Sequence, residues 1–549
     1  MTFHKIMALV AMALLWVGSQ VPAYLYGGVP PYIYGDIGGV DRWTWFILGY
    51  LFSLGAVTPF VGSVSDLFGR RYTAMGGATL IIIGSIVTAT AHTMNTFIAG
   101  MCLCGAGAGL CELTAIAVTS ELAPTRKRGL YVAILTFTIL PFCPSVFWAQ
   151  QISYYGSWRY IGLICGIISF LGLVLVALFY HPPPRHVTVG LSRKEVLRRV
   201  DFIGGFLLLG GLLLFMAAVQ WGGYQYAWGS AHVVAPLVIG IVMCIAFAVY
   251  EWKFARYPMF PGSIAKEPRI LLLTLFITFV SGHQFFALIL FWPTQSYNEY
   301  GHDHWQVGIR NLALGFPIMA GACIILVALS FTRGRIRELM LISCIFMTAG
   351  TGAMAALNTS NVWLSYLLLI IAGLGIGGIV VPASVITAII CPDELIATVT
   401  ALTLAIRVLG GAIGYSIYYN VFSEKFKANA INLVGIACFK AGIIDKATIA
   451  EIINLTAAGL VDAIREVPGV KTDAAWESIV VAGQEAYAKS YPYVYYVSIA
   501  FGGVAIIASL FLGDIKKYMD DHIAADYEES INSAEEHKAG HVTGAQVAA

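Results

Sequence analysis

Charged residues are scarce in this sequence. Asp, Glu, Lys and Arg make up 11% of its 549 residues, whereas soluble proteins carry about 25%. A soluble fold of this length and apolarity would have too little charge to cover its surface. The 32 basic residues are balanced by 30 acidic residues, so no basic excess is available to neutralise phosphates. We therefore expect no nucleic-acid partner.

Motifs of hydrolytic and nucleotide-dependent enzymes are also lacking. The sequence contains no Walker A, HExxH or GxSxG motif, which argues against an ATPase, a metalloprotease or a lipase. The run Gly373–Gly378 fits a dinucleotide fingerprint but lies within an apolar segment, where it indicates helix packing. The ten cysteines form no disulfide framework. We therefore expect no enzyme, no metal and no cofactor.

Hydrophobic residues, in contrast, make up 58% of the chain. Because about 20 apolar residues cross a bilayer as a helix, each apolar run of that length predicts one transmembrane helix. The predicted fold class is an all-α polytopic membrane protein. We predict 14 spans, at 6–28, 43–62, 72–92, 97–119, 129–151, 158–180, 202–221, 233–251, 270–292, 307–330, 338–357, 362–390, 396–421 and 492–513.

Basic residues are distributed unevenly between the loops. With the N-terminus inside, most Lys and Arg fall in the inner segments, whereas the short outer loops hold only Arg42 and Arg159. Cytoplasmic loops of membrane proteins carry such an excess. We predict that both termini are cytoplasmic, and we expect a monomer embedded in the lipid bilayer of the plasma membrane.

The largest predicted outer segment is the loop 422–490. Its apolar positions at helical spacing predict an amphipathic helix that lies on the membrane or packs on the spans. Asn454 begins a glycosylation sequon in this loop, so Asn454 is a candidate modification site.

Ionisable residues inside the spans are candidates for the transport machinery, because a charge within a bilayer is costly. Glu112 shares a helix face with Gly105 and Gly109, and small residues on that face let another helix approach. The carboxylate is therefore expected to point into the bundle. We predict proton coupling at Glu112; a structural carboxylate that accepts hydrogen bonds across helices is the alternative.

Arg407 has a similar environment, because it shares a helix face with Gly411 and Gly414. It could bind an anionic substrate, pair with a carboxylate or hold helices together. Polar and aromatic residues of other spans could line a substrate cavity, or could serve only in packing. With Arg407, the candidates for the cavity are Gln20, Trp148, His283, Gln284 and Tyr415.

The segment between the second and third spans carries a recognisable motif. It contains Gly62, Asp66, Gly69, Arg70 and Arg71, in a spacing that resembles the cytoplasmic signature loop of the major facilitator superfamily, Gly-x-x-x-Asp-x-x-Gly-Arg-Arg/Lys. Glycines permit a tight turn there, and a charge latch can hold one access state until it is broken. We predict that this loop governs an inner gate.

A wider resemblance covers about residues 5–515. Glu121, Arg126 and Arg128 resemble the second inner signature loop of the superfamily. The chain is also similar to the 14-span drug:proton antiporter family, in particular to its fungal branch of trichothecene efflux pumps and siderophore transporters. The fifth span departs from that family, because Pro141 and Pro144 replace a glycine-rich pattern; these prolines could bend a gating helix.

The resemblance implies two six-helix bundles with two extra helices between them. The expected regions are an N-terminal bundle 1–181, linker helices 182–269, a C-terminal bundle 270–513 with its outer loop 422–490, and a cytoplasmic tail 514–549. It also implies secondary transport by alternating access, with proton-coupled efflux of a small, largely apolar compound such as a toxin, drug or secondary metabolite. The alternatives are proton-coupled uptake of a siderophore–iron complex and a non-transporting nutrient sensor.

Overall fold

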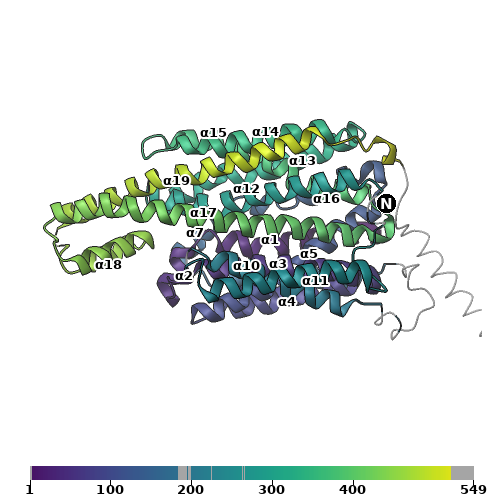
Figure 1. Ribbon diagram of the computed structural model, residues 1–549, viewed down its shortest axis with the longest axis horizontal. Coiled ribbons are helices and arrows are strands. Elements are labelled where there is room, and N and C mark those ends of the chain that lie inside the picture. The colour runs from purple at the N-terminus through teal and green to yellow at the C-terminus, as the bar shows by residue number, and fades with distance from the viewer. Residues whose placement is uncertain are drawn as a thin grey trace, which may run out of the picture.

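The structure is a computed structural model that describes residues 3–182, 195, 199–223, 225–262, 264, 266–470 and 472–520. The described part is a bundle of long helices that is elongated along the helix axes (Figure 1). The N-terminus lies at one end of the bundle, and α2 (Pro30–Ile37) and α18 (Lys446–Ala457) lie at the other (Figure 1). We call these the N-terminal end and the α18 end. Most of the predicted tail 514–549 lies outside the described residues.

The first group of helices packs around α5. A Cβ on Gly105 of α5 would lie 2.1 Å from the carbonyl oxygen of Tyr50 in α3, so glycine is what allows these two helices to approach so closely. The members of this group, besides α2, are α1 (Phe3–Tyr26), α3 (Thr44–Phe68), α4 (Arg70–Ala89), α5 (Met94–Leu122), α6 (Arg128–Phe137), α7 (Ser145–Tyr155) and α8 (Tyr160–Phe179).

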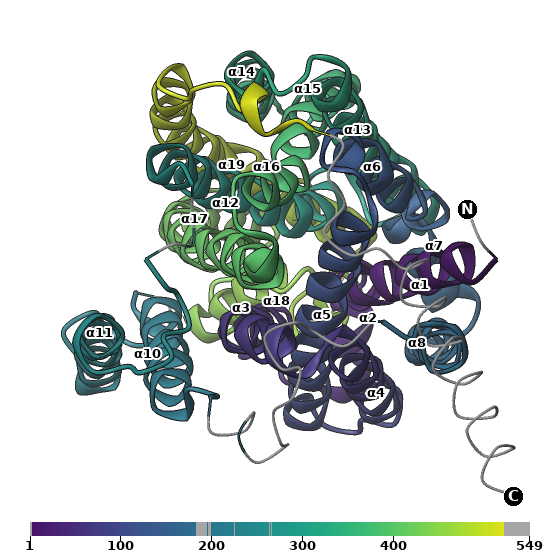
Figure 2. The same cartoon turned by 90° about the vertical axis from the view of Figure 1, so that its right-hand side faces the viewer.

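The second group meets the first where α3 packs on α17 and where α6 and α7 pack on α13. Between the two groups in the sequence lie α10 (Phe202–Trp221) and α11 (Ala231–Lys253), which sit at the side of the bundle (Figure 2). The second group comprises, besides α18, the helices α12 (Pro268–Tyr300), α13 (His304–Phe331), α14 (Ile336–Ala353), α15 (Val362–Val380), α16 (Pro382–Ile389), α17 (Ile396–Lys440) and α19 (Asp473–Leu510).

Thirteen helical segments of the described chain are long and apolar enough to cross a membrane. The predicted span 129–151 is not among them, because it is broken into α6, the 3-10 turn η2 (Leu140–Phe142) and α7. Pro141 and Pro144 lie at this break, so the predicted bend is confirmed. Counted as one broken crossing, this segment makes the fold consistent with 14 spans.

The predicted outer segment 422–490 is largely helical in the structure. The helix α17 continues to Lys440 and α19 already begins at Asp473, so only the stretch between them turns back, through α18 and the 3-10 turn η6 (Asp462–Glu466). Hydropathy marks where α17 loses its apolar character, but Glu424, Lys425 and their neighbours form helices well. No proline or glycine breaks the chain before Gly435.

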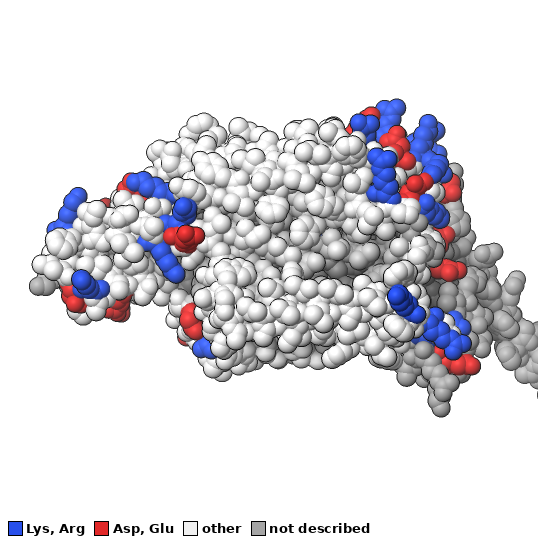
Figure 3. All heavy atoms as spheres, in the orientation of Figure 1, with Lys and Arg blue, Asp and Glu red and all other residues white. Residues whose placement is uncertain are grey.

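Charged side chains gather at the two ends of the molecule, and the face between them is almost free of charge (Figure 3). A band of this kind matches the hydrocarbon core of a bilayer, in which charged side chains are costly. Large apolar side chains are exposed on the outer helices, with Trp252 of α11 and Phe331 of α13 as examples. The chain is therefore a multi-pass membrane protein.

Candidate functional site

A central cavity lies between the two groups of helices. Its wall is mostly apolar, and its free volume is about 90 Å³. Pockets that hold drug-sized ligands measure about 300–1,000 Å³, so the cavity must widen before it accepts such a compound. Helices of both groups contribute to the wall; among the lining residues are Trp16, Gln20, Tyr24, Glu112, Cys143, Phe285, Pro293, Asn311, Met319 and Arg407.

Glu112 and Arg407 form an ion pair in the wall of this cavity. Arg407 Nη2 donates to Glu112 Oε1 at 2.6 Å, and both side chains are at most 5% exposed. Because Glu112 lies on α5 and Arg407 on α17, the pair joins the two groups of helices. Of the three roles considered for Arg407, pairing with a carboxylate is the one seen here.

Other polar groups of the cavity come from α1 and α13. The Tyr24 hydroxyl donates to Gln20 Oε1 at 2.9 Å, one helical turn away. Asn311 Nδ2 donates to the carbonyl oxygen of Val307, and its Oδ1 atom has no hydrogen-bond partner. Tyr24 and Asn311 are absent from the sequence candidates. Their position one turn after Gln20 and within the predicted span 307–330 is the signal that could have identified them.

Four predicted cavity residues do not line this cavity. His283 packs within the second group, where its Nδ1 atom lies 2.7 Å from the Tyr418 hydroxyl. Gln284 donates to the carbonyl oxygen of Ser498, and Tyr415 stacks on aromatic rings of the same group. Trp148 is 43% exposed on α7. A polar or aromatic residue inside a span can make its hydrogen bonds or ring contacts with a neighbouring helix. Hydropathy does not tell which face of its own helix the residue occupies.

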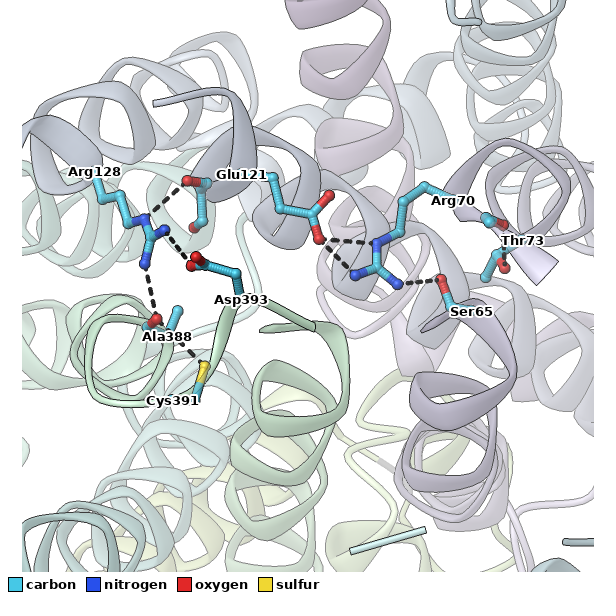
Figure 4. Close-up of polar contacts among 10 residues, drawn as sticks. Ser65, Arg70, Thr73, Glu121, Arg128, Ala388, Cys391 and Asp393 are labelled. Carbon is cyan, nitrogen blue, oxygen red and sulfur yellow. Dashed lines mark hydrogen bonds and ion pairs between the residues drawn. The ribbon is translucent and has the colours of Figure 1, made fainter. Parts of the chain in front are cut away.

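The signature loop forms the turn between α3 and α4 at the N-terminal end. Gly69 has a φ angle of 93°, a conformation that favours glycine. Arg70 is 1% exposed; its Nη2 atom donates to Glu121 at 2.5 Å and its Nη1 atom donates to Ser65 (Figure 4). All of these residues belong to the first group, so this pair holds α4 to α5. Arg71 donates to the carbonyl oxygen of Ala177 in α8.

Two further members of the predicted signature complete this picture. A Cβ on Gly62 would lie 2.5 Å from Cβ of Ala401 in α17, so Gly62 marks a close contact between the two groups of helices. The side chain of Asp66, predicted to act with Arg70 at the inner gate, lies outside the described part of the structure.

Arg128, by contrast, bridges the two groups of helices. Its Nη1 atom donates to the carbonyl oxygen of Ala388 at 2.9 Å and its Nη2 atom to Asp393 Oδ1 at 3.2 Å (Figure 4). Its Nε atom donates to the carbonyl oxygen of Ser120 in its own group. Arg128 is 1% exposed, whereas Arg126, two residues earlier, is exposed. The second inner signature loop therefore supplies a hydrogen-bonded contact between the two groups through Arg128.

The α18 end is bridged as well. The Tyr34 hydroxyl of α2 donates to the carbonyl oxygen of Ala458, just after α18, while Tyr487 of α19 donates to the carbonyl oxygens of Thr456 and Ala457. A small second cavity under this segment shares Pro293 with the central cavity. Asn454 is exposed on α18, but Thr456 of its sequon is buried.

Comparisons with known proteins find a matching family and similar sequences. The family model described as fungal trichothecene efflux pump matches residues 11–543. A trichothecene efflux pump of Fusarium sporotrichioides is 26% identical over 90% of this chain and 83% of its own length. The corresponding pump of Trichoderma arundinaceum is 29% identical over the same shares of the two chains.

Solved structures show the same fold. The proton:xylose symporter XylE superposes with a TM-score of 0.57, covering 94% of this chain and 98% of XylE at 13% identity. The human organic anion transporter MFSD10 superposes with a TM-score of 0.52, covering 91% and 100% at 13% identity. The fold is that of the major facilitator superfamily. Within the described residues, no cluster of three or more His, Cys, Asp or Glu side chains could hold a metal ion.

Proposed function

The chain belongs to the family of fungal trichothecene efflux pumps, and on this premise we propose that it exports a small, largely apolar organic compound in exchange for protons. A membrane transporter of the major facilitator superfamily is the function that the family and the relatives establish. Proton coupling, outward direction and alternating access are the steps that we add.

The ion pair between Glu112 and Arg407 is the observation that carries this proposal. It lies in the cavity wall, joins the two groups of helices and is almost completely buried. A proton on Glu112 would remove the negative charge that holds Arg407. The pair would then loosen, and the two groups could move relative to each other. Proton binding at one residue would thus be converted into a change of access.

Contacts at the two ends support alternating access. Arg128 joins the groups at the N-terminal end, and the Tyr34 hydrogen bond joins them at the α18 end. With both ends bridged and a cavity of about 90 Å³, this conformation suits an occluded step of the cycle. Each half-cycle then breaks the bridge at one end and keeps the other.

The nature of the wall supports an apolar cargo. Aliphatic and aromatic side chains dominate it, and Gln20, Asn311 and Arg407 provide a few polar groups for orientation. A trichothecene, the compound class named for the relatives, is the cargo to test first. We assign the N-terminal end to the cytoplasm of a cell with the protein in its plasma membrane, since basic loops concentrate there.

The test measures uptake of a radiolabelled trichothecene into inside-out membrane vesicles with an imposed pH gradient, acidic inside. The wild type should concentrate the compound, and a protonophore should abolish this. Glu112→Gln should lose concentrative transport but keep exchange of labelled for unlabelled compound across the membrane. Glu338→Gln, at an exposed glutamate of α14, is the matched control and should behave as wild type.

Because Glu112→Gln leaves a buried Arg407 without its counter-charge, it is expected to lower stability by about 3–5 kcal/mol. The double variant Glu112→Gln with Arg407→Gln restores neutrality and should fold while remaining uncoupled. Concentrative transport by this double variant at the wild-type rate would overturn the role of Glu112. Concentration of a ferric siderophore in right-side-out vesicles, without any trichothecene transport, would establish the uptake alternative instead.

A further inference from the structure

A second buried carboxylate lies in the second group of helices, apart from the cavity. Glu299 is the penultimate residue of α12, at the α18 end, and is 2% exposed. No Lys or Arg of the described chain forms an ion pair with it within 4.0 Å. An ionised carboxylate buried without a positive partner is strongly disfavoured. Glu299 thus differs from Glu112, whose charge is balanced by Arg407.

The hydrogen bonds of Glu299 are incomplete. Gln295 Nε2 donates to Glu299 Oε2 at 2.8 Å, and the Tyr495 hydroxyl of α19 donates to Gln295 Oε1. Glu299 Oε1 makes no hydrogen bond of good geometry, although the hydroxyl of the neighbouring Tyr300 lies close to the carboxyl. The donors therefore end at Oε2, and a bound proton on Oε1 would supply the hydrogen that this oxygen lacks.

The charged and titratable groups around this carboxyl are few. From α13, Arg310 is engaged elsewhere: its Nη1 atom donates to the carbonyl oxygen of Ser296, and its Cζ atom lies 5.6 Å from the centre of the Tyr300 ring. From α19, the neighbours are the phenols of Tyr491 and Tyr495. These two phenols are neutral at physiological pH. The positive charge near this carboxyl is therefore that of Arg310.

We propose that Glu299 is a second proton-binding site of the transporter, loaded from the α18 side. The proton comes from water, binds to Oε1 and leaves to water when the carboxyl is exposed again. The proposal rests on the proton coupling proposed above. It assigns separate tasks to the two acids: Glu112 joins the two groups of helices, whereas Glu299 links α12 to α19 through Gln295 and Tyr495.

The position of Glu299 in α12 supports loading of the proton from the α18 side. Glu299 precedes Tyr300, the last residue of α12, and Gly301 and the short segment before α13 follow. The carboxyl thus lies within a few residues of the aqueous face at the α18 end. A movement of the end of α12 against α19 would expose it, because the hydrogen-bond chain from Tyr495 through Gln295 is what holds it inside.

Infrared spectroscopy of the purified protein tests the site directly. The variant is Glu299→Gln, which keeps the shape and can still accept from Gln295; the control is Glu485→Gln, an exposed acid of α19 paired with Lys489 on the surface. We expect a protonated-carboxyl band near neutral pH in the wild type and the control, and its loss in Glu299→Gln. An identical carboxyl signal in all three proteins would overturn the proposal.

Proton counting in proteoliposomes provides the second measurement. The ratio of protons moved to substrate moved should fall in Glu299→Gln, while exchange of labelled for unlabelled substrate continues and the melting temperature stays near that of the wild type. An unchanged ratio would assign Glu299 a structural role and overturn the proposal. If the wild type itself moves no protons, the proposed coupling fails, and the infrared measurement still decides whether Glu299 binds a proton.

Discussion

Replacing Arg128 with alanine is expected to open the N-terminal end of the central cavity. The Arg128 guanidinium makes three hydrogen bonds, and two of them cross between the groups of helices, to Ala388 and Asp393. The third, to Ser120, stays within the first group. It contributes equally whether this end is shut or open, so only the two crossing bonds bias access.

The size of this bias follows from the two contacts. A buried hydrogen bond from a charged group to a carbonyl contributes about 1.5–3 kcal/mol. Asp393 is 37% exposed, so its ion pair with Arg128 is screened and adds up to about 1 kcal/mol. The total, about 1.5–4 kcal/mol, corresponds to a roughly 10- to 900-fold change in the equilibrium between the shut and open states. Asp393→Asn should change that equilibrium less than about fivefold.

Cys143 offers a built-in reporter, because it lines the central cavity and is only 8% exposed. We expect a membrane-impermeant maleimide, added to inside-out vesicles, to modify Cys143 of the Arg128→Ala variant at least about 10 times faster than in the wild type. Mass spectrometry of the Cys143 peptide separates this reaction from those of the nine other cysteines.

The matched control is Arg126→Ala, which removes a positive charge from the same loop. Arg126 is exposed, and its side chain makes no hydrogen bond within the described residues. This variant should label Cys143 at the wild-type rate. Equal labelling of the Arg128→Ala and Arg126→Ala variants would refute the assignment of Arg128 as the bridge that keeps this end shut.

Two further substitutions test the packing and the opposite end. Gly105→Ala would place a Cβ 2.1 Å from the carbonyl oxygen of Tyr50, so it should lower stability by about 1–3 kcal/mol and lower the melting temperature in detergent. In Gly166→Ala the new Cβ would meet its nearest neighbour at 3.8 Å, so the melting temperature should not fall. A similar fall in both variants would contradict the packing argument. Tyr34→Phe removes the bond to Ala458, worth about 1 kcal/mol, and should raise maleimide labelling of Cys143 from the α18 side roughly fivefold. Tyr154→Phe, at an exposed tyrosine of α7, should leave that rate unchanged.

The fold could be predicted from the sequence because the bilayer imposes a simple rule. Every crossing needs an apolar stretch of sufficient length, and the part of the chain that the structure describes contains thirteen such helices. Pro141 and Pro144 mark the broken crossing, because a proline interrupts the backbone hydrogen bonding of a helix. The long extensions of α17 and α19 escaped this rule, because a helix that leaves the bilayer no longer needs apolar residues.

The site could be predicted only in part, because pairing depends on which helix faces meet. Burial cost identifies Glu112 and Arg407 as residues that need partners, but their contact joins positions 295 residues apart. Glu299 was missed for a different reason. It lies beyond the predicted span 270–292, where a charge is unremarkable, and it is the rotation of α12 against α19 that buries it.

The burial of two loop arginines also depends on how the helices pack. Arg70 and Arg128 belong to segments predicted as inner loops, yet each is 1% exposed. A buried guanidinium is costly unless carboxylates and carbonyl oxygens surround it, and both residues have such partners. An arginine held in this way cannot leave its partners without water entering the gap. In this fold Arg128 bridges both groups from a loop, and this position suits it to act as a gate.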